Sequence, residues 1–433
     1  MQRQPEEGII LEGVHYFAVK DRGVSTDPEN GGQEKPMKTT VAAIDFGTSK
    51  IVTLVAENSG SQRCDITAAG VTKYDGYLEE GWNNPGMLDE AIRRSIADAE
   101  EQSGSKIKEI NVGVPGAFTH VYATKVTIPL KGTDPRVTAA DVKAAFSKAA
   151  ENLTNVPGVV VHSSPAWFMV DSGKKTLEPV GMKGREMTAF ISFAVGNRFF
   201  IDDVTNRMAD LGIVVTGFYS TSAGEAMLYL NEQERDHTSV LIDMGYLNTE
   251  IIGVEGDAII YHKVLDVGGG NLAVALAEEL DISLSAAEDI KRKFVYGIET
   301  SGETYEVPGA DGQKGTVFTR EQVKPVLCTE LDDICAKIKE AVDDDFGGLG
   351  SWSNVFLTGG GLNFNRGGKE YLAGRLGRPV QETPRRTTKL NSHCFSSALG
   401  LMDLIIDTIE QQRQPAAGAS GKIKDFFRSL LGG

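Results

Sequence analysis

The sequence predicts an α/β protein made of two similar halves that face each other across a cleft. The first observation is a hairpin tip of the type Asp-x-Gly, which follows a short apolar strand at Ile44–Lys50 and again at Leu241–Ile251. Such a recurrence indicates a duplicated structural unit. The second observation is a strand, Asn354–Leu357, that runs into a turn of consecutive glycines. Glycines in this position leave the backbone open to a flat ligand such as adenine or ribose.

Composition limits the classes of function. A chain of 433 residues is long enough for two or more domains. Its net charge of −16 argues against a nucleic-acid-binding protein, because phosphate backbones attract basic surfaces. The four cysteines lack metal-binding spacing, so we interpret them as reduced thiols of a cytoplasmic protein. We find no signal-peptide layout and no apolar run long enough to span a membrane.

The first hairpin tip offers groups suited to phosphate. Gly47 lets the backbone approach a ligand closely, while Thr48 and Ser49 present hydroxyl and N–H groups. Lys50 adds a positive charge, and Asp45 can hold a hydrated Mg²⁺ ion. The alternative is a plain turn, since turns also favour these residue types.

The second tip differs in sequence but offers similar groups. Asp243 ends its strand, Gly245 opens the turn, and Asn248 supplies a hydrogen-bond donor. Two such tips facing each other can hold a polyphosphate and its Mg²⁺ from both sides. The glycine turn would then contact the nucleoside. The alternative interpretation is that these glycines only form a tight connection between a strand and a helix. That turn consists of Gly359, Gly360 and Gly361.

The order of the elements predicts how the chain is divided. Strands around the first tip and a helix at Met87–Glu101 form the first half, a segment of α+β texture ends with the helix Arg198–Leu211, and the strand Ile213–Tyr219 opens the second half. The expected divisions are a flexible arm (1–38), the first half (39–123, completed by a helix at 391–412), an α+β insertion (124–203), the second half (204–270 and 352–390), its smaller subdomain (271–351), a linker (413–420) and a terminal helix (421–433).

The terminal helix has the pattern of an in-plane membrane anchor. Its apolar residues follow the spacing i, i+3, i+4, i+7, i+8, which places them on one helical face, and basic residues occupy the rest. A basic amphipathic helix behind a linker is typical of membrane surfaces. The alternative is a helix that docks on the protein itself or on a partner. The apolar residues are Ile423, Phe426, Phe427, Leu430 and Leu431, and the basic residues are Lys422, Lys424 and Arg428.

The ordered motifs resemble the signature of the actin, DnaK and sugar-kinase superfamily, whose halves are ribonuclease-H-like domains. More narrowly, the chain is similar to FtsA, a family of bacterial cell-division proteins. Pro179–Gly184 resembles the family's Pro-x-Gly-Met-x-Gly turn, and Ala287–Lys291 resembles its Ala-Glu-x-x-Lys helix. The resemblance implies an actin-like fold of duplicated ribonuclease-H-like domains, with an α+β insertion in the first half and a C-terminal amphipathic helix.

The resemblance also implies ATP and Mg²⁺ as ligands. Asp45 and Asp243 would hold Mg²⁺ through water, while Glu288 and Lys291 would flank ribose and adenine. Glu225 resembles the water-positioning site of actins and MreB, where it would serve hydrolysis together with Asp243. A solvated helix carboxylate is the alternative for Glu225.

Partners and location follow from the same resemblance. It implies the C-terminal peptide of FtsZ, other divisome proteins, self-association into filaments and an anionic membrane surface at the division septum, with no nucleic acid. One departure concerns the second tip, where Tyr246 and Leu247 replace the family's usual glycines, so we expect a weak ATPase at most. Two alternatives stay open: a PilM-like pilus-assembly adaptor and a sugar or acid kinase.

Overall fold

The computed structural model describes residues 39–58, 65–78, 81–298, 302–309, 315–347, 350, 353–384 and 390–413. The predicted N-terminal arm, the linker beyond residue 413 and the predicted membrane helix lie outside the described residues. Within the described part of the chain, no helix combines the length and apolar character that crossing a membrane requires.

Two five-stranded sheets share one strand order. The first runs β10-β6-β1-β2-β3 and the second β17-β16-β11-β12-β13, so each has an antiparallel meander followed by two parallel strands. The first sheet consists of β1 (Thr39–Phe46), β2 (Lys50–Asn58), β3 (Asp65–Lys73), β6 (Glu109–Val114) and β10 (Val214–Ser220). The second consists of β11 (Ser239–Met244), β12 (Thr249–Glu255), β13 (Ala258–Leu265), β16 (Val355–Thr358) and β17 (Gln381–Glu382). The predicted duplication is therefore present in the topology.

Helices cover both faces of each sheet, which explains why the central strands are apolar almost throughout. Helices α1 (Pro85–Ser103) and α3 (Arg198–Asp210) pack on one face of the first sheet, and α10 (Ser396–Arg413) packs on the other. The second sheet lies between α4 (Thr221–Tyr229) and a group formed by α6 (Gly269–Leu280), α7 (Leu284–Lys293), α8 (Arg320–Glu340) and α9 (Gly368–Leu376). The short elements are β4 (Tyr77–Leu78), β5 (Gly81–Trp82), α5 (Glu232–Arg235), β14 (Thr304–Val307) and β15 (Thr316–Thr319).

Local sequence signals set the ends of α1. The Asn84 side chain accepts a hydrogen bond from the backbone N–H of Met87, and Pro85 occupies the first helical position, where its missing N–H costs nothing. At the other end Gly104 adopts a left-handed conformation that stops the helix. Its buried face, which includes Leu88, Ile92 and Ile96, packs on the first sheet.

Two elements lie elsewhere than the sequence order predicted. β10 was expected to open the second half, but it forms the edge of the first sheet, in parallel with β6. Helix α3 was expected to close the insertion, but Phe200, Val204 and Met208 pack into the core of the first half. Both elements therefore return the chain to the first half before the second half begins.

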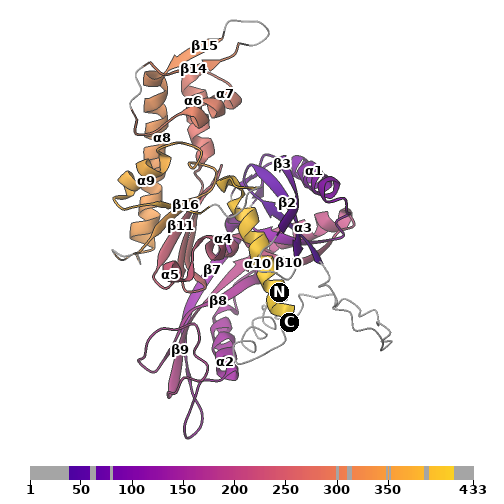
Figure 1. Cartoon of the computed structure of the whole chain (residues 1–433), viewed down its shortest axis with the longest axis vertical. Coiled ribbons are helices and arrows are strands. Elements are labelled where there is room, and N and C mark those ends of the chain that lie inside the picture. The colour runs from indigo at the N-terminus through magenta and orange to yellow at the C-terminus, as the bar shows by residue number, and fades with distance from the viewer. Residues whose placement is uncertain are drawn as a thin grey trace, which may run out of the picture.

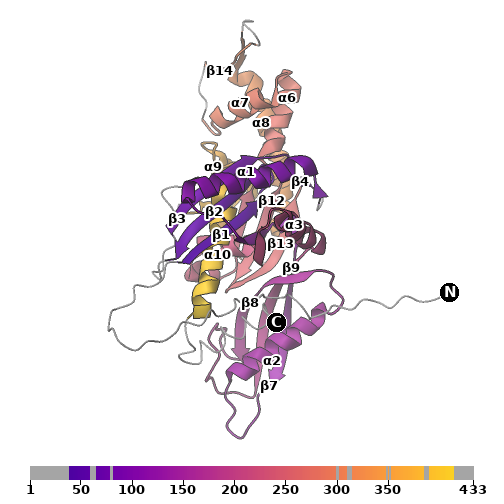
Figure 2. The ribbon, with the colours of Figure 1, turned by 90° about the vertical axis from the view of Figure 1, so that its right-hand side faces the viewer.

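The insertion is a three-stranded antiparallel sheet backed by one helix. Its order is β7-β9-β8, with β7 (Thr119–Pro129), β8 (Val159–Val170), β9 (Glu186–Gly196) and α2 (Ala139–Ala150). A capping box between Thr138 and Asp141 starts α2, and Phe146 anchors that helix on the sheet. Figures 1 and 2 show the insertion at one end of the long axis and β14, β15 and α6–α8 at the other.

The two halves meet through a pair of helices. Helix α4 belongs to the second half and α10 to the first, and they cross where Gly224 faces Gly400. A Cβ atom at Gly224 would lie 2.4 Å from the Gly400 carbonyl oxygen. Small residues are therefore required at this crossing, which confirms the close helix packing predicted from Ser397–Leu401.

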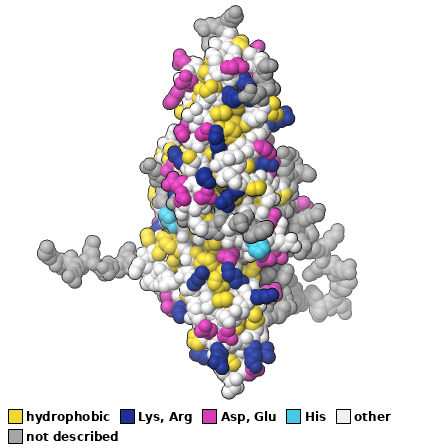
Figure 3. All heavy atoms as spheres, turned by 90° about the vertical axis from the view of Figure 1, so that its left-hand side faces the viewer, with side chains coloured by type: hydrophobic (Ala, Val, Ile, Leu, Met, Phe, Trp, Pro, Cys, Tyr) yellow, Lys and Arg dark blue, Asp and Glu magenta, His cyan; other side chains and the backbone are white. Residues whose placement is uncertain are grey.

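Charge is unevenly distributed over the molecule. Residues 119–196 contain nine Lys and Arg and six Asp and Glu, a net +3 in a chain of net −16, so the rest carries −19. Figure 3 shows Lys and Arg gathered at the lower end, over the insertion. The insertion is thus a basic module on an acidic protein.

Candidate nucleotide-binding site

The two hairpin tips lie in direct contact. The Thr48 hydroxyl oxygen of the first tip accepts a hydrogen bond at 3.1 Å from the backbone N–H of Leu247 in the second. Each tip is closed by one backbone hydrogen bond, from Gly47 to Lys50 at 3.0 Å and from Gly245 to Asn248 at 2.9 Å. Hydroxyl and N–H groups from both halves therefore converge on one small region.

Carboxylates surround this region, and their pKa values are raised. Burial raises the pKa of Asp45 to about 6, although a hydrogen bond from Ser397 (2.7 Å) and the charge of Lys50 oppose it. Burial, together with the charges of Glu250 and Asp45, raises the pKa of Asp243 to about 7. Both pKa values are raised mainly because burial disfavours the charged carboxylate, and for Asp243 the nearby charges of Glu250 and Asp45 add to this effect.

Glu250 is the most firmly held carboxylate of the group. It lies opposite Asp243 in the β11–β12 register and accepts hydrogen bonds from Ser222 Oγ (2.7 Å), the Gly116 N–H (3.2 Å) and His262 Nε2 (3.2 Å). Burial acts to raise the pKa of Glu250, but these hydrogen bonds outweigh it and leave the pKa below its ordinary value. The lowered pKa of Glu250 favours its ionised form, whereas the raised pKa of Asp243, which lies beside it, favours the protonated form.

Glu225 lies at the floor of the site on α4. Its side chain is buried, and burial followed by the charge of Asp243 raises its pKa well above the ordinary value. A side-chain hydrogen bond joins it to Asp243, while its Oε1 atom has no hydrogen-bond partner. Glu225 is thus a buried carboxyl group rather than a solvated helix carboxylate, and its raised pKa favours the protonated form.

The glycine turn packs against the second tip. A Cβ atom at Gly359 would lie 2.1 Å from Asp243 Oδ1, and one at Gly361 would lie 2.3 Å from the Gly245 carbonyl oxygen. Gly359 also has a positive φ of 85°, which other residues adopt only with strain. The chain itself occupies the space beside these two glycines, and Gly360 faces Cys394. A small pocket of about 130 Å³ opens beside Gly359, lined also by Asn363, Phe364 and Asn391–His393.

The predicted ribose-side pair is held by internal contacts. Lys291 is buried, donates to the Gly269 carbonyl at 2.7 Å and pairs with Glu288 at 2.7 Å. Its ammonium group lies 5.6 Å from the centre of the Tyr246 ring. Tyr246 therefore bridges the second tip and α7, and this is a consequence of the aromatic residue that replaces a glycine.

Most of the predicted residues come together, and four unpredicted ones join them. Asp45, Thr48 and Lys50 meet the second tip, whereas Ser49 contributes its carbonyl to Tyr74 N–H at 3.3 Å. The unpredicted residues are Ser222, Glu250, His262 and Ser397. The hairpin register alone could have found Glu250, because a tip that closes between Gly245 and Asn248 pairs Asp243 with it.

Comparison with known proteins agrees with this geometry. The family model "Cell division protein FtsA" matches residues 240–400, and "SHS2 domain inserted in FTSA" matches residues 116–193. The cell division protein FtsA of Neisseria meningitidis serogroup B is 24% identical over 393 residues, which cover 88% of this chain and 93% of the relative. FtsA of Streptococcus pneumoniae serotype 2 is 24% identical over 302 residues, which cover 69% of this chain and 66% of the relative.

Solved structures of low sequence identity share the fold. The PilM–PilN type IV pilus biogenesis complex aligns with a TM-score of 0.55 at 18% identity, over 85% of this chain and 98% of the other. MreB5 of Spiroplasma citri bound to AMPPNP aligns with a TM-score of 0.53 at 11% identity, over 86% and 97%. These alignments confirm the predicted actin-like fold. The two family models, together with the relatives, show that the chain belongs to the FtsA family of cell division proteins.

Proposed function

We propose that the chain binds ATP and Mg²⁺ between its two halves, assembles into filaments and links the FtsZ ring to the membrane. The observation that best supports nucleotide binding is the meeting of Thr48 and Leu247 among carboxylates from both halves. A phosphate group placed between the tips would replace their mutual hydrogen bond with hydrogen bonds to its own oxygens. ATP would then hold the two halves together.

The carboxylates fit a hard cation such as Mg²⁺. Asp45 and Asp243 offer buried oxygen ligands whose charged forms burial disfavours in the absence of a cation, and Mg²⁺ prefers oxygen ligands while keeping several waters. Among the described residues, no group of three His, Cys, Asp or Glu side chains is placed to hold a metal ion directly. Bound Mg²⁺ would neutralise the charge on the phosphates.

Calorimetry with Mg·ATP tests this proposal. We expect Asp45→Ala and Asp243→Ala each to weaken binding at least about tenfold, about 1.4 kcal/mol, because each removes an oxygen ligand near the metal. Asp289→Ala is a matched control, since this carboxylate is exposed on α7, on the side away from Ala287 and Ile290, which pack in the core. Wild-type affinity in the double variant would refute the site.

Hydrolysis is expected to be slow. The Tyr246 ring contacts Lys291 and lies against Gly270, so the second tip carries a bulky side chain where bare backbone is usual for the family. We expect turnover well below about 1 s⁻¹, the low end of ordinary enzymes, and Glu225→Gln should reduce whatever turnover remains. A steady-state phosphate-release assay measures both, and turnover at ordinary enzyme rates would contradict this expectation.

Filament formation and FtsZ binding are proposed from the family, with one feature of the chain in support. The insertion carries net +3 and the rest of the chain −19, so a head-to-tail contact through the insertion would bring opposite charges together. The membrane link would come from residues 421–433, whose pattern suits an anionic surface.

A further inference from the structure

The insertion is fixed to the first half at both of its ends. The segment η1 (Gly116–Phe118) leads into β7, and α3 receives the chain from β9. The Asn197 N–H donates to the Phe118 carbonyl at 2.8 Å, which joins the two connections. The ring centres of Phe118 and Phe200 lie 4.8 Å apart, and the ring centres of Phe200 and Phe46, at the first tip, lie 5.6 Å apart.

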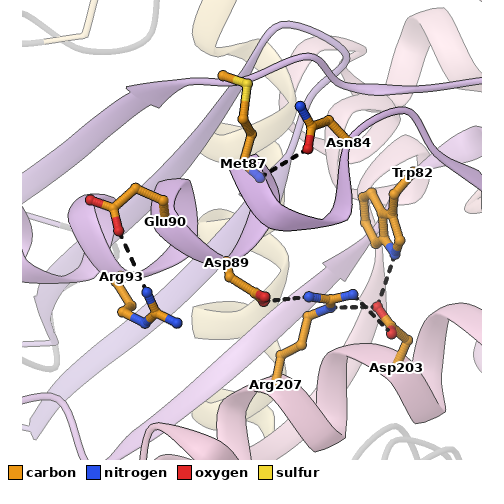
Figure 4. Close-up of polar contacts among 8 residues, drawn as sticks. All are labelled: Trp82, Asn84, Met87, Asp89, Glu90, Arg93, Asp203 and Arg207. Atoms are coloured by element: carbon orange, nitrogen blue, oxygen red, sulfur yellow. Dashed lines mark hydrogen bonds and ion pairs between the residues drawn. The ribbon is translucent and has the colours of Figure 1, made fainter.

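A polar network reinforces this attachment (Figure 4). Trp82 Nε1 and Arg207 Nε both donate to Asp203 Oδ2, at 2.8 and 2.7 Å, and Arg207 also pairs with Asp89 of α1. Bidentate contacts of arginine with carboxylates hold geometry well. Helix α3, and with it the exit from the insertion, is therefore held on α1.

The same insertion also packs on the second half. Ser192 Oγ donates to the Ile259 carbonyl at 2.5 Å, and the Asp257 N–H donates to the Pro165 carbonyl at 3.1 Å. Gly256, in the β12–β13 turn, approaches the insertion so closely that a Cβ atom there would lie 2.0 Å from the Ala166 carbonyl oxygen. A rigid module attached to both halves cannot keep all these contacts when the halves move relative to each other.

One hydrogen bond joins this module to the nucleotide site. Glu250 lies on β12 opposite Asp243, and it accepts a hydrogen bond from the Gly116 N–H, the first residue of the connection. A Cβ atom at Gly116 would lie 2.3 Å from the Glu250 carboxyl group. The contact between the second tip and the entrance to the insertion therefore depends on a glycine.

We propose that the Gly116–Glu250 hydrogen bond transmits the nucleotide state of the cleft to the insertion. This proposal rests on the proposed binding of Mg·ATP. Closure of the two halves on nucleotide shifts β12, and Glu250 carries that shift to η1, so the insertion adjusts its contacts with the β12–β13 turn. By linkage, any contact on the insertion that favours one position changes the affinity of the site.

Hydrogen–deuterium exchange of the full chain, with and without saturating Mg·AMPPNP, tests the proposal. The reporter is the Asp257 amide and its β8 partner segment, because that hydrogen bond crosses between the insertion and the second half. The variant Gly116→Ala places its new Cβ atom against the Glu250 carboxyl group, and the three atoms nearest to that Cβ all belong to Glu250, not to the proposed Mg²⁺ ligands Asp45 and Asp243. The matched control is Gly196→Ala, at the other connection, where the new Cβ meets Val161 and Ile201 side chains.

We expect wild type and Gly196→Ala to show a nucleotide-dependent change in exchange at the reporter, and Gly116→Ala to lose it while calorimetry still detects binding. The proposal would be overturned if Gly116→Ala showed the same nucleotide-dependent change in exchange as wild type. It would also be overturned if wild type bound nucleotide but showed no change in exchange at the reporter. Ser192→Ala removes the hydrogen bond to Ile259 between the insertion and the second half, so it should also reduce the change in exchange. This variant replaces Gly116→Ala in the test if Gly116→Ala does not fold. Absence of binding to wild type, seen by calorimetry, would instead refute the proposed function, and this inference with it.

Discussion

The carboxylates of the site make the stability of the nucleotide-free chain depend on pH. In the folded state Asp45 and Asp243 have pKa values of about 6 and about 7, against 3.8 in the unfolded chain. Between these values the folded state binds more protons than the unfolded state, so stability is highest below about pH 4 for these two groups and falls as pH rises through 6 and 7. At about 1.4 kcal/mol per pKa unit, these two differences set an upper limit of about 7 kcal/mol on the loss.

Thermal melting measures this effect. We expect the nucleotide-free chain to melt at lower temperature at pH 8 than at pH 5.5, and Asp243→Asn to raise the melting temperature at pH 8, because the amide cannot ionise. Adding Mg·ATP should recover stability at pH 8. The exposed Asp289→Asn serves as a control, and an equal pH dependence in wild type and Asp243→Asn would contradict the assignment.

At the same scale, the sequence identifies groups more readily than their partners. Asp45 and Asp243 follow from the strand-and-tip pattern, because that pattern is local. Ser397 donates to Asp45 from a helix that is separated from it by most of the chain, and no local pattern specifies such a contact. The hydrogen bond from Lys291 to the Gly269 carbonyl could not be predicted from the sequence either, because it depends on how α6 and α7 pack.

Among the elements, the α4–α10 crossing is the most sensitive to volume. A Cβ atom at Gly400 would lie 2.5 Å from the Glu225 backbone nitrogen, and backbone cannot move aside as a side chain can. Gly400→Val should therefore destabilise the fold by about 3–5 kcal/mol, in the range of severe steric changes. Gly374→Ala in α9, where no atom lies within 4 Å of the new Cβ, should instead stabilise it by about 1 kcal/mol. Urea unfolding measures both, and a neutral Gly400→Val would show that the helices can separate.

Element types follow from apolar periodicity, whereas element neighbours do not. The sequence predicted the strand β10 but not its pairing with β6, because an apolar strand can form the edge strand of either sheet. Helix α3 raises the same difficulty, since its apolar face fits any apolar partner. The duplication was predictable because two tips and their flanking strands repeat one pattern, and both sheets share one order.

For the whole molecule, the separable prediction concerns residues 421–433, which follow the folded core. Removing them should abolish co-sedimentation with anionic vesicles and leave Mg·ATP binding intact, because the apolar face and the basic residues of this segment supply the proposed contact with lipid. Phe427→Glu should act like the deletion, since it places a charge in the apolar face. Charge reversal at Lys422 and Lys424 should weaken binding more at low salt than at high salt. Undiminished pelleting of the truncated chain would place the membrane contact elsewhere.

The position of α10 has a mechanical consequence. This helix packs along β1 and β2 of the first half, crosses α4 of the second, and continues in sequence toward residues 421–433. If those residues hold a membrane, tension between membrane and filament enters the fold through α10 before it reaches any other element. A pull along the axis of α10 would load many side-chain contacts between helix and sheet in shear at once, rather than peel them apart one by one. The first half, which supplies Asp45 and Thr48, is therefore the half on which such a force would act first.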